Sequence, residues 1–271
     1  IYVLTINQYV KAESLQQAYE LNQKKNNVIL GGMLWLKMQK KSVGTAIDLS
    51  DLGLDKIEET EDSYLLGAMV TLRSLELHKG LNSMTNNAVA ESLKHIVGIQ
   101  FRNLATVGGS IFGRYGFSDV LTLLMALNAQ VELYQKGIVS IEEFSKMPYD
   151  NDLLVRVIIK KQEMKVAYLS QRNTKTDFPV LTCAISNMEG TYRCVIGARP
   201  KRAVCLYDNN DILKDGITPE SAEKFGEYIK SQIITGSNMR ASEEYRKVLS
   251  GVLTKRALLK LKDCEVTSYA D

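Results

Sequence analysis

Two segments of the chain combine paired glycines with small or apolar neighbours, a pattern that leaves backbone N–H groups open to a ligand. They are Val28-Ile-Leu-Gly-Gly-Met-Leu34 and Thr106-Val-Gly-Gly-Ser110. A strand that ends in Gly-Gly exposes consecutive N–H groups with no side chain in the way, as close binding of a diphosphate requires. The second segment adds two hydroxyls. Each alone could be an ordinary tight turn, whereas the two together could converge on one dinucleotide, without the GxGxxG spacing of a Rossmann fold.

Other reactive side chains are scarce. The four cysteines form no CxxC pair, so their spacing fits neither an iron–sulfur cluster nor a zinc site, and we expect them to be reduced and structural: Cys183, Cys194, Cys205 and Cys264. His78 and His95 are the only histidines, which excludes His-based metal clusters and most His-dependent triads. We therefore predict no catalytic side chain and no metal, and chemistry supplied by a bound cofactor.

The charge balance and hydropathy limit the possible partners. The chain has 34 basic and 31 acidic residues spread along its length, which does not indicate nucleic-acid binding. No run approaches the roughly 18 consecutive apolar residues of a membrane span, and the N-terminus lacks the order of a signal peptide. We expect a cytoplasmic protein that does not bind a membrane.

The elements that must position these segments mix helix and strand. In the first half, the apolar spacing predicts helices over 14–24, 72–78, 88–97 and from 118 onward, and strands over 28–30, 45–49, 64–70, 130–134 and 153–159. From residue 165 the pattern changes to strands over 180–186, 192–198 and 202–207, with Glu189-Gly190 as a hairpin signal. Thr218-Pro219 predicts a helix start, and 242–262 forms a long amphipathic helix.

Several of these segments together resemble a known family. Val28-Ile-Leu-Gly-Gly32, Phe101-Arg-Asn-Leu-Ala-Thr-Val-Gly-Gly-Ser-Ile111, Ser118-Asp119 and Leu123-Leu-Met-Ala-Leu-Asn-Ala129 are similar to the FAD-binding subunits of molybdopterin-containing hydroxylases, such as xanthine dehydrogenase and carbon monoxide dehydrogenase. Ser237-Asn-Met-Arg-Ala-Ser-Glu-Glu-Tyr-Arg246 and Lys255-Arg-Ala-Leu258 resemble their C-terminal helix. The resemblance covers nearly the whole chain.

The resemblance implies an α+β fold of two domains. Residues 1–162 would form a p-cresol-methylhydroxylase-type FAD-binding domain with two lobes, about 1–55 and 56–162. Residues 163–271 would form the C-terminal domain of these flavoproteins, an α+β domain with a three-stranded antiparallel sheet and helices.

The resemblance also assigns the FAD site. The first loop would wrap the diphosphate with Asn27, Val28, Ile29, Leu30, Gly31, Gly32, Met33 and Leu34. The second would hold diphosphate and ribityl oxygens with Thr106, Val107, Gly108, Gly109 and Ser110, and Asp119 would accept hydrogen bonds from sugar or ribityl hydroxyls. Ile96 and Leu154 would enclose the adenine, unless they are ordinary core residues.

Some assignments keep a second interpretation. Asp119 could simply be a carboxylate stabilised at a helix start. Tyr115 and Phe117 could cover the isoalloxazine, face a partner subunit or have no role. Arg172 and Asp177 match a segment that passes near the flavin, or form a surface ion pair.

The implied function is electron transfer within a hetero-oligomeric oxidoreductase of the xanthine dehydrogenase type. A molybdopterin-binding large subunit would hydroxylate the substrate, and electrons would pass through a 2Fe-2S small subunit to this FAD and on to NAD or another acceptor. The chain departs from the family in three places: Met33-Leu34 replaces Thr-Asp or Thr-Glu, Leu169 replaces a frequent lysine near the flavin, and Trp35 is unusual. Leu169 is still expected to be a cofactor-binding residue. An FAD-free scaffold subunit and a stand-alone flavoprotein reductase therefore remain alternatives.

Overall fold

The computed structural model describes residues 3–267 and arranges them in two compact units, each built from separate stretches of the chain. Unit 1 consists of Ile1–Leu75, Ile99–Gly113 and Ala129–Lys160, and unit 2 of Glu76–Gly98, Arg114–Asn128 and Lys161–Asp271. The predicted division into domains 1–162 and 163–271 stays a prediction. Residues 1–2 and 268–271, at the ends of these two domains, lie outside the described part.

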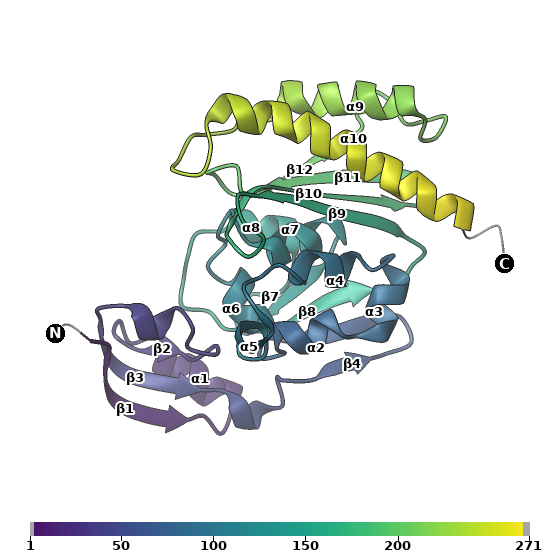
Figure 1. Ribbon diagram of the computed structural model, residues 1–271. Helices are drawn as coiled ribbons and strands as arrows, with labels where there is room; N and C mark the ends of the chain where they lie inside the picture. The colour runs from purple at the N-terminus through teal and green to yellow at the C-terminus, as the bar shows by residue number, and fades with distance from the viewer. Residues whose placement is uncertain (1–2, 268–271) are drawn as a thin grey trace. The chain divides into compact units, whose positions relative to one another are not determined.

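Unit 1 begins with a small parallel sheet that carries the first glycine segment (Figure 1). Its strand order is β1 (Thr5–Lys11), β3 (Ser42–Asp48) and β2 (Val28–Ile29). The helix α1 (Leu15–Asn22) connects β1 to β2, and its apolar residues pack with Ile47 and Leu49. The short 3₁₀ helices η1 (Leu36–Met38) and η2 (Ser50–Leu52) flank β3. Because β2 is only two residues long, the chain leaves the sheet directly into the glycine loop.

A five-stranded antiparallel sheet forms the rest of unit 1. Its strand order is β4 (Ile57–Glu59), β5 (Ser63–Gly67), β8 (Leu154–Lys160), β6 (Gln130–Leu133) and β7 (Gly137–Ser140). The apolar alternation of β8 places Val155, Val157 and Ile159 in the core. The helices of this unit are short: α2 (Leu72–Glu76, whose last residue falls in unit 2), α5 (Ile99–Arg102), α6 (Val107–Ile111) and α8 (Ile141–Lys146).

Unit 2 is a four-stranded antiparallel sheet covered by helices on both faces (Figure 1). The strands β9 (Lys165–Arg172), β10 (Pro179–Met188), β11 (Thr191–Gly197) and β12 (Val204–Tyr207) follow one another across the sheet. The long helices α9 (Pro219–Gln232) and α10 (Glu243–Thr267) cover one face, and α7 (Asp119–Ala126) covers the other. The helices α3 (Lys79–Met84) and α4 (Ala88–Leu93) complete the unit.

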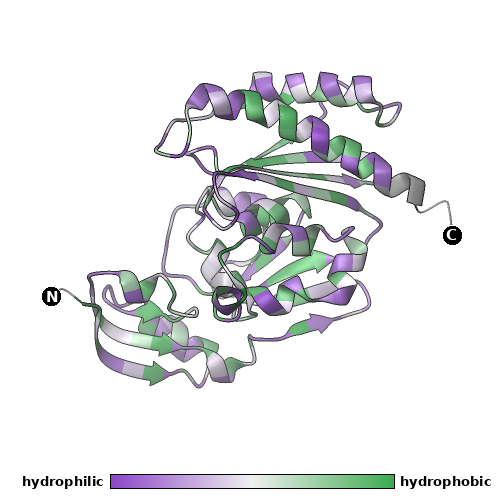
Figure 2. Ribbon diagram, viewed as in Figure 1, coloured by the Kyte–Doolittle hydropathy of each residue, from purple (hydrophilic) through white to green (hydrophobic). Residues whose placement is uncertain are grey.

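The two faces of this sheet differ in character. The face under α9 and α10 is an apolar cluster, visible as green bands on strands and helices in Figure 2, and it includes Val180, Ile185, Phe225 and Leu253. The face under α7 carries polar contacts, such as Thr122 with Thr182 at 3.2 Å between hydroxyl oxygens. All eight residues of α7 are buried, so this helix is fixed in place along its whole length.

The predicted α+β fold class is confirmed, with several corrections. The sheet of unit 2 has four strands and not three, because β9 pairs with β10 along nearly its full length. The helix predicted over 88–97 ends at Leu93, and Val97 adopts a left-handed φ of 50°. Cys183, Cys194 and Cys205 are free and buried, whereas the side chain of Cys264 lies outside the described part. Among the described helices, none has the length and apolar content to cross a membrane.

Candidate functional site

The first glycine loop is held against the segment that follows α5. Gly32 has φ +78°, and a Cβ atom at this position would lie 2.0 Å from the backbone oxygen of Leu104. Only glycine fits both the left-handed conformation and this close approach. The indole of Trp35 lies edge-on to Phe101, with 5.8 Å between ring centroids. The loop is therefore shaped by its contacts with residues 101–105 and not only by its own sequence.

The same loop presents a run of unpaired backbone N–H groups. Within residues 3–267, no acceptor receives the N–H of Gly31, Gly32, Met33 or Leu34. The run is bounded on its N-terminal side by Leu30, whose N–H donates to Ile47 O at 2.8 Å. Gly32 and Met33 are successive left-handed residues, and consecutive N–H groups in such turns can converge on one anion. This is the arrangement that a diphosphate needs.

The side chain of Asn27 makes structural hydrogen bonds, and its predicted cofactor contact stays a prediction. Its side-chain amide donates to Leu21 O at 2.8 Å and its Oδ1 accepts from the N–H of Thr45 at 2.9 Å, while its own N–H donates to Lys24 O. These bonds fix the entry to β2 between α1 and β3. The groups available to a ligand therefore begin at Gly31, after the strand.

The second glycine segment is the start of a helix and not a turn after a strand. Thr106 is the N-cap of α6, and its Oγ1 accepts from the N–H of Gly109 at 3.1 Å. The N–H groups of Val107 and Gly108 donate to Val70 O and Ala68 O at 2.9 and 2.8 Å. Because these N–H groups are already used, the segment does not offer a ligand a second row of N–H groups. It offers the hydroxyl of Thr106 and the hydroxyl oxygen of Ser110, whose proton is donated to Thr106 O at 2.7 Å.

The glycines of this segment serve close packing. A Cβ at Gly108 would lie 2.8 Å from Ala68 O, and a Cβ at Gly109 would lie 3.3 Å from Gly31 O and 3.0 Å from Thr106 Oγ1. A Cβ at Gly31 would in turn lie 3.7 Å from Gly109 Cα. The structure thus brings the two pairs of glycines, 77 residues apart in sequence, into direct contact within unit 1.

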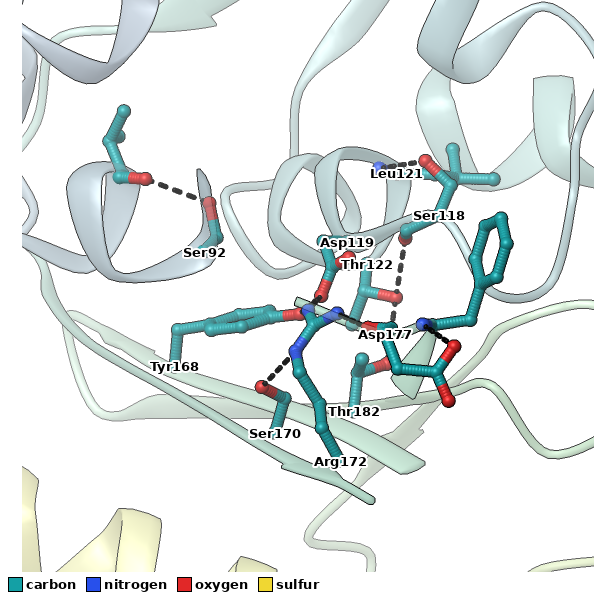
Figure 3. A network of polar contacts seen from close by, with 12 residues as sticks. Ser92, Ser118, Asp119, Leu121, Thr122, Tyr168, Ser170, Arg172, Asp177 and Thr182 are labelled. Atoms are coloured by element: carbon teal, nitrogen blue, oxygen red, sulfur yellow. Dashed lines mark hydrogen bonds and ion pairs between the residues drawn. The ribbon is translucent and has the colours of Figure 1, made fainter. Parts of the chain in front are cut away.

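The polar centre of unit 2 is Asp119, at the first position of α7 (Figure 3). Its Oδ1 accepts from the hydroxyl of Tyr168 at 2.5 Å and from Nη2 of Arg172. All three side chains are buried, with 6% exposure for both members of the ion pair. Ser118 caps the helix, since its Oγ accepts from the N–H of Leu121 at 3.1 Å. No described residue donates a side-chain hydrogen bond to the second carboxylate oxygen of Asp119, Oδ2.

Burial and the neighbouring groups act on the carboxyl of Asp119 in opposite directions. Burial raises the pKa of Asp119, while the charge of Arg172 and the hydrogen bonds from Tyr168 and Arg172 oppose that rise. Burial and the neighbouring carboxylate raise the pKa of Tyr168 well above its ordinary value, so its hydroxyl stays a donor. Oδ1 of Asp119 is thus held by two side-chain donors, whereas Oδ2 receives none from the described residues.

The sequence analysis did not identify Tyr168 and Arg172 as partners of Asp119. Tyr168, Ser170 and Arg172 alternate along β9 and so lie on the face of the sheet that meets α7. The surface ion pair considered for Arg172 and Asp177 is not formed between their side chains: Nη1 of Arg172 donates to the backbone oxygen of Asp177 at 2.6 Å, and the carboxylate of Asp177 pairs with Arg240 at 3.1 Å.

The remaining predicted residues lie apart from these clusters. Leu169 packs against the apolar cluster under α9 and α10, on the opposite face of the sheet from Tyr168. Leu154 is buried in β8 of unit 1 opposite Leu133, and Ile96 is half-buried in unit 2 after α4. The cofactor contacts predicted for these three residues stay predictions.

Tyr115 and Phe117 form an exposed aromatic pair in unit 2. Their rings are stacked, with 5.2 Å between centroids, and their exposures are 57% and 42%. Phe117 meets the ring of Phe178 edge-on at 4.8 Å, and the guanidinium of Arg240 lies 5.1 Å above Phe178. The roles suggested for the pair, covering the isoalloxazine or facing a partner subunit, stay predictions.

Comparison with known proteins identifies the class to which these features belong. Residues 5–162 match the family model of the FAD binding domain in molybdopterin dehydrogenase. The chain belongs to this family, as the resemblance predicted, and its cofactor is FAD. The unpaired N–H run has the donors that the diphosphate of FAD needs. The chain is a medium, FAD-binding subunit of the molybdenum hydroxylase family.

Relatives cover almost the full chain. The uncharacterized protein YgfM of Escherichia coli K12 is 26% identical over 253 residues, 92% of this chain and 93% of its own length. The glyceraldehyde dehydrogenase medium chain of Sulfolobus acidocaldarius is 23% identical over 92% of this chain and 96% of its own. A structure of carbon monoxide dehydrogenase from Oligotropha carboxidovorans superimposes with a TM-score of 0.82 at 21% identity, covering 96% of this chain and 98% of that chain.

Proposed function

We propose that this chain is the electron-transfer subunit of a xanthine dehydrogenase-like molybdenum hydroxylase. It would receive electrons from a 2Fe-2S small subunit, which takes them from a molybdopterin-binding large subunit, and deliver them to NAD or another acceptor. Bound FAD supplies the exchange between single electrons and a hydride, which no protein side chain provides. Family membership and the medium chains among the relatives support a role within a larger complex.

The observation that carries the proposal is the loop Gly31–Leu34 beside Gly109. Its four free N–H groups would hold the diphosphate, because a phosphate oxygen is strongly bound by several N–H donors in one concave turn. The hydroxyls of Thr106 and Ser110 would contact the same region of the cofactor, and Asp119 would accept from a sugar or ribityl hydroxyl. Met33 and Leu34 would contribute only their backbone N–H groups, because they lack the side-chain hydroxyl and carboxylate that relatives often have at these positions.

The test is a visible absorption spectrum of the purified full chain, followed by mass determination of the molecule released on heating. We expect flavin bands near one FAD per chain, and no substrate hydroxylation until the partner subunits are added. A colourless protein that also fails to bind added FAD would leave only the scaffold role. Steady turnover of a reduced donor by the isolated chain would instead establish a stand-alone reductase.

A further inference from the structure

Arg172 is held by contacts to every part of its guanidinium group. Its Nε donates to Ser170 Oγ at 3.2 Å, its Nη1 to the backbone oxygen of Asp177 at 2.6 Å, and its Nη2 to Asp119. Two of these three acceptors belong to β9 and the loop that follows it, so the guanidinium is oriented by its own segment. It is thereby presented to the start of α7 in one fixed direction (Figure 3).

Among the described residues, both side-chain donors to Asp119 bind the same carboxylate oxygen. Tyr168 and Arg172 both donate to Oδ1, and the carboxylate lies in the first turn of a helix of eight buried residues. A carboxylate with 6% exposure and no cation would tend to take up a proton or turn toward another donor. The two β9 residues oppose both, and they leave Oδ2 without a side-chain donor from the described residues.

We propose that Arg172 and Tyr168 are positioning residues that hold the carboxylate of Asp119 with Oδ2 directed at a hydroxyl of the FAD sugar or ribityl chain. The inference rests on the proposed function and adds to it two residues that act through Asp119 and not by contact with the cofactor. A lysine at position 172 could restore the charge but not the three-way hydrogen bonding, because its ammonium is a single point donor.

A double-mutant cycle tests whether the two residues act through Asp119. FAD affinity is measured by titrating apo-protein with FAD and following the quenching of flavin fluorescence, for the wild type, Arg172→Met, Asp119→Asn and the double variant. We expect Arg172→Met alone to raise the Kd about tenfold, the loss of roughly one charge-assisted hydrogen bond. In the Asp119→Asn background the same substitution should change the Kd by less than about twofold, because residues that act as a unit are not additive.

Two further variants separate positioning from folding. Arg172→Lys should recover only part of the affinity. Tyr168→Phe, which removes a single hydroxyl, should raise the Kd for FAD about threefold. In the Asp119→Asn background, Tyr168→Phe should leave the Kd unchanged. The matched control is Arg199→Met, which removes another partly buried arginine of unit 2 whose guanidinium donates to the backbone oxygens of Arg202 and Ile234. It should leave the Kd unchanged.

The outcomes are distinguishable. If the wild type binds FAD and the effects of Arg172→Met and Asp119→Asn multiply, Arg172 acts independently and the positioning role is wrong, while the proposed function stands. If the wild type binds no FAD, both are wrong. Where Arg172→Met does not fold by circular dichroism, the cycle of Tyr168→Phe with Asp119→Asn decides in its place, and additive effects there overturn the proposal.

Discussion

At the scale of single residues, two glycines of unit 1 separate backbone conformation from close packing. Gly32 and Gly53 both have positive φ, +78° and +67°. A Cβ at Gly53 would meet no atom within 4 Å, whereas a Cβ at Gly32 would lie 2.0 Å from Leu104 O and 2.8 Å from its carbonyl carbon. Substitution of Gly53 therefore measures the free-energy cost of a side chain in the left-handed conformation alone. Substitution of Gly32 measures that cost together with the cost of disturbing the contact that shapes the ligand loop.

We expect Gly53→Ala to lower the free energy of unfolding by about 1 kcal/mol, the usual cost of a side chain in the left-handed region. Gly32→Ala should cost at least about 2 kcal/mol and also weaken FAD binding, because the loop must move away from Leu104 and its N–H groups move with it. Urea unfolding and FAD titration of both variants measure the two effects. Equal destabilisation by the two substitutions, with FAD affinity retained, would contradict the role given to Gly32.

The residue scale also shows what the sequence could not reveal. The glycine segments and Asp119 have recognisable neighbours along the chain, so their positions could be predicted. Tyr168 and Arg172 are separated from Asp119 by 49 and 53 positions, and only the packing of β9 against α7 brings them together. Leu169 illustrates the converse: it adjoins Tyr168 in sequence, but strand alternation turns it toward the opposite face.

At the scale of elements, the starts of two helices organise the polar groups. Thr106 caps α6 and so closes the second glycine segment into a helical turn, which uses the N–H groups that a Gly-Gly turn would have left open. The sequence pattern of a threonine three residues before the second glycine permits both structures. The contact with Ala68, distant in the chain, selects the helix. Ser118 has the corresponding place at α7, where the next residue is Asp119.

Removing the cap of α7 should affect both stability and ligand binding. We expect Ser118→Ala to lower the free energy of unfolding by about 1 kcal/mol and to weaken FAD binding, since the first turn that carries Asp119 loses its side-chain acceptor. Ser140→Ala, which removes the equivalent N-cap of α8 with the same 3.1 Å bond to a backbone N–H, is the matched control. It should cost similar stability without a change in FAD affinity. A loss of affinity in both variants would show that the effect is general destabilisation.

At the scale of the whole molecule, each compact unit gathers segments that are far apart in the sequence. Unit 2 takes residues 76–98 and 114–128 from the middle of the chain in addition to its C-terminal part. The order of strand and helix patterns along the sequence shows the change near residue 165. It does not show that residues 76–98 and 114–128 belong to unit 2, because a helix such as α7 has the same pattern of apolar residues whichever sheet it covers. The fold class was therefore predictable, and the interleaving of segments was not.

The last prediction concerns the stability of the whole chain, because a ligand that binds only the folded state stabilises it by mass action. At a free FAD concentration of about one hundred times the Kd, the free energy of unfolding should rise by about 2.7 kcal/mol. For a chain of this size that corresponds to an increase of about 5–10 °C in Tm, measurable by circular dichroism.

Riboflavin, which lacks the diphosphate, should give a much smaller shift at the same concentration. The Gly32→Ala variant should show a reduced shift with FAD, because its altered loop no longer presents the N–H groups of Gly31–Leu34 together. If riboflavin and FAD raised the Tm equally, these N–H groups would not hold the diphosphate, and the loop would have to be assigned a different role.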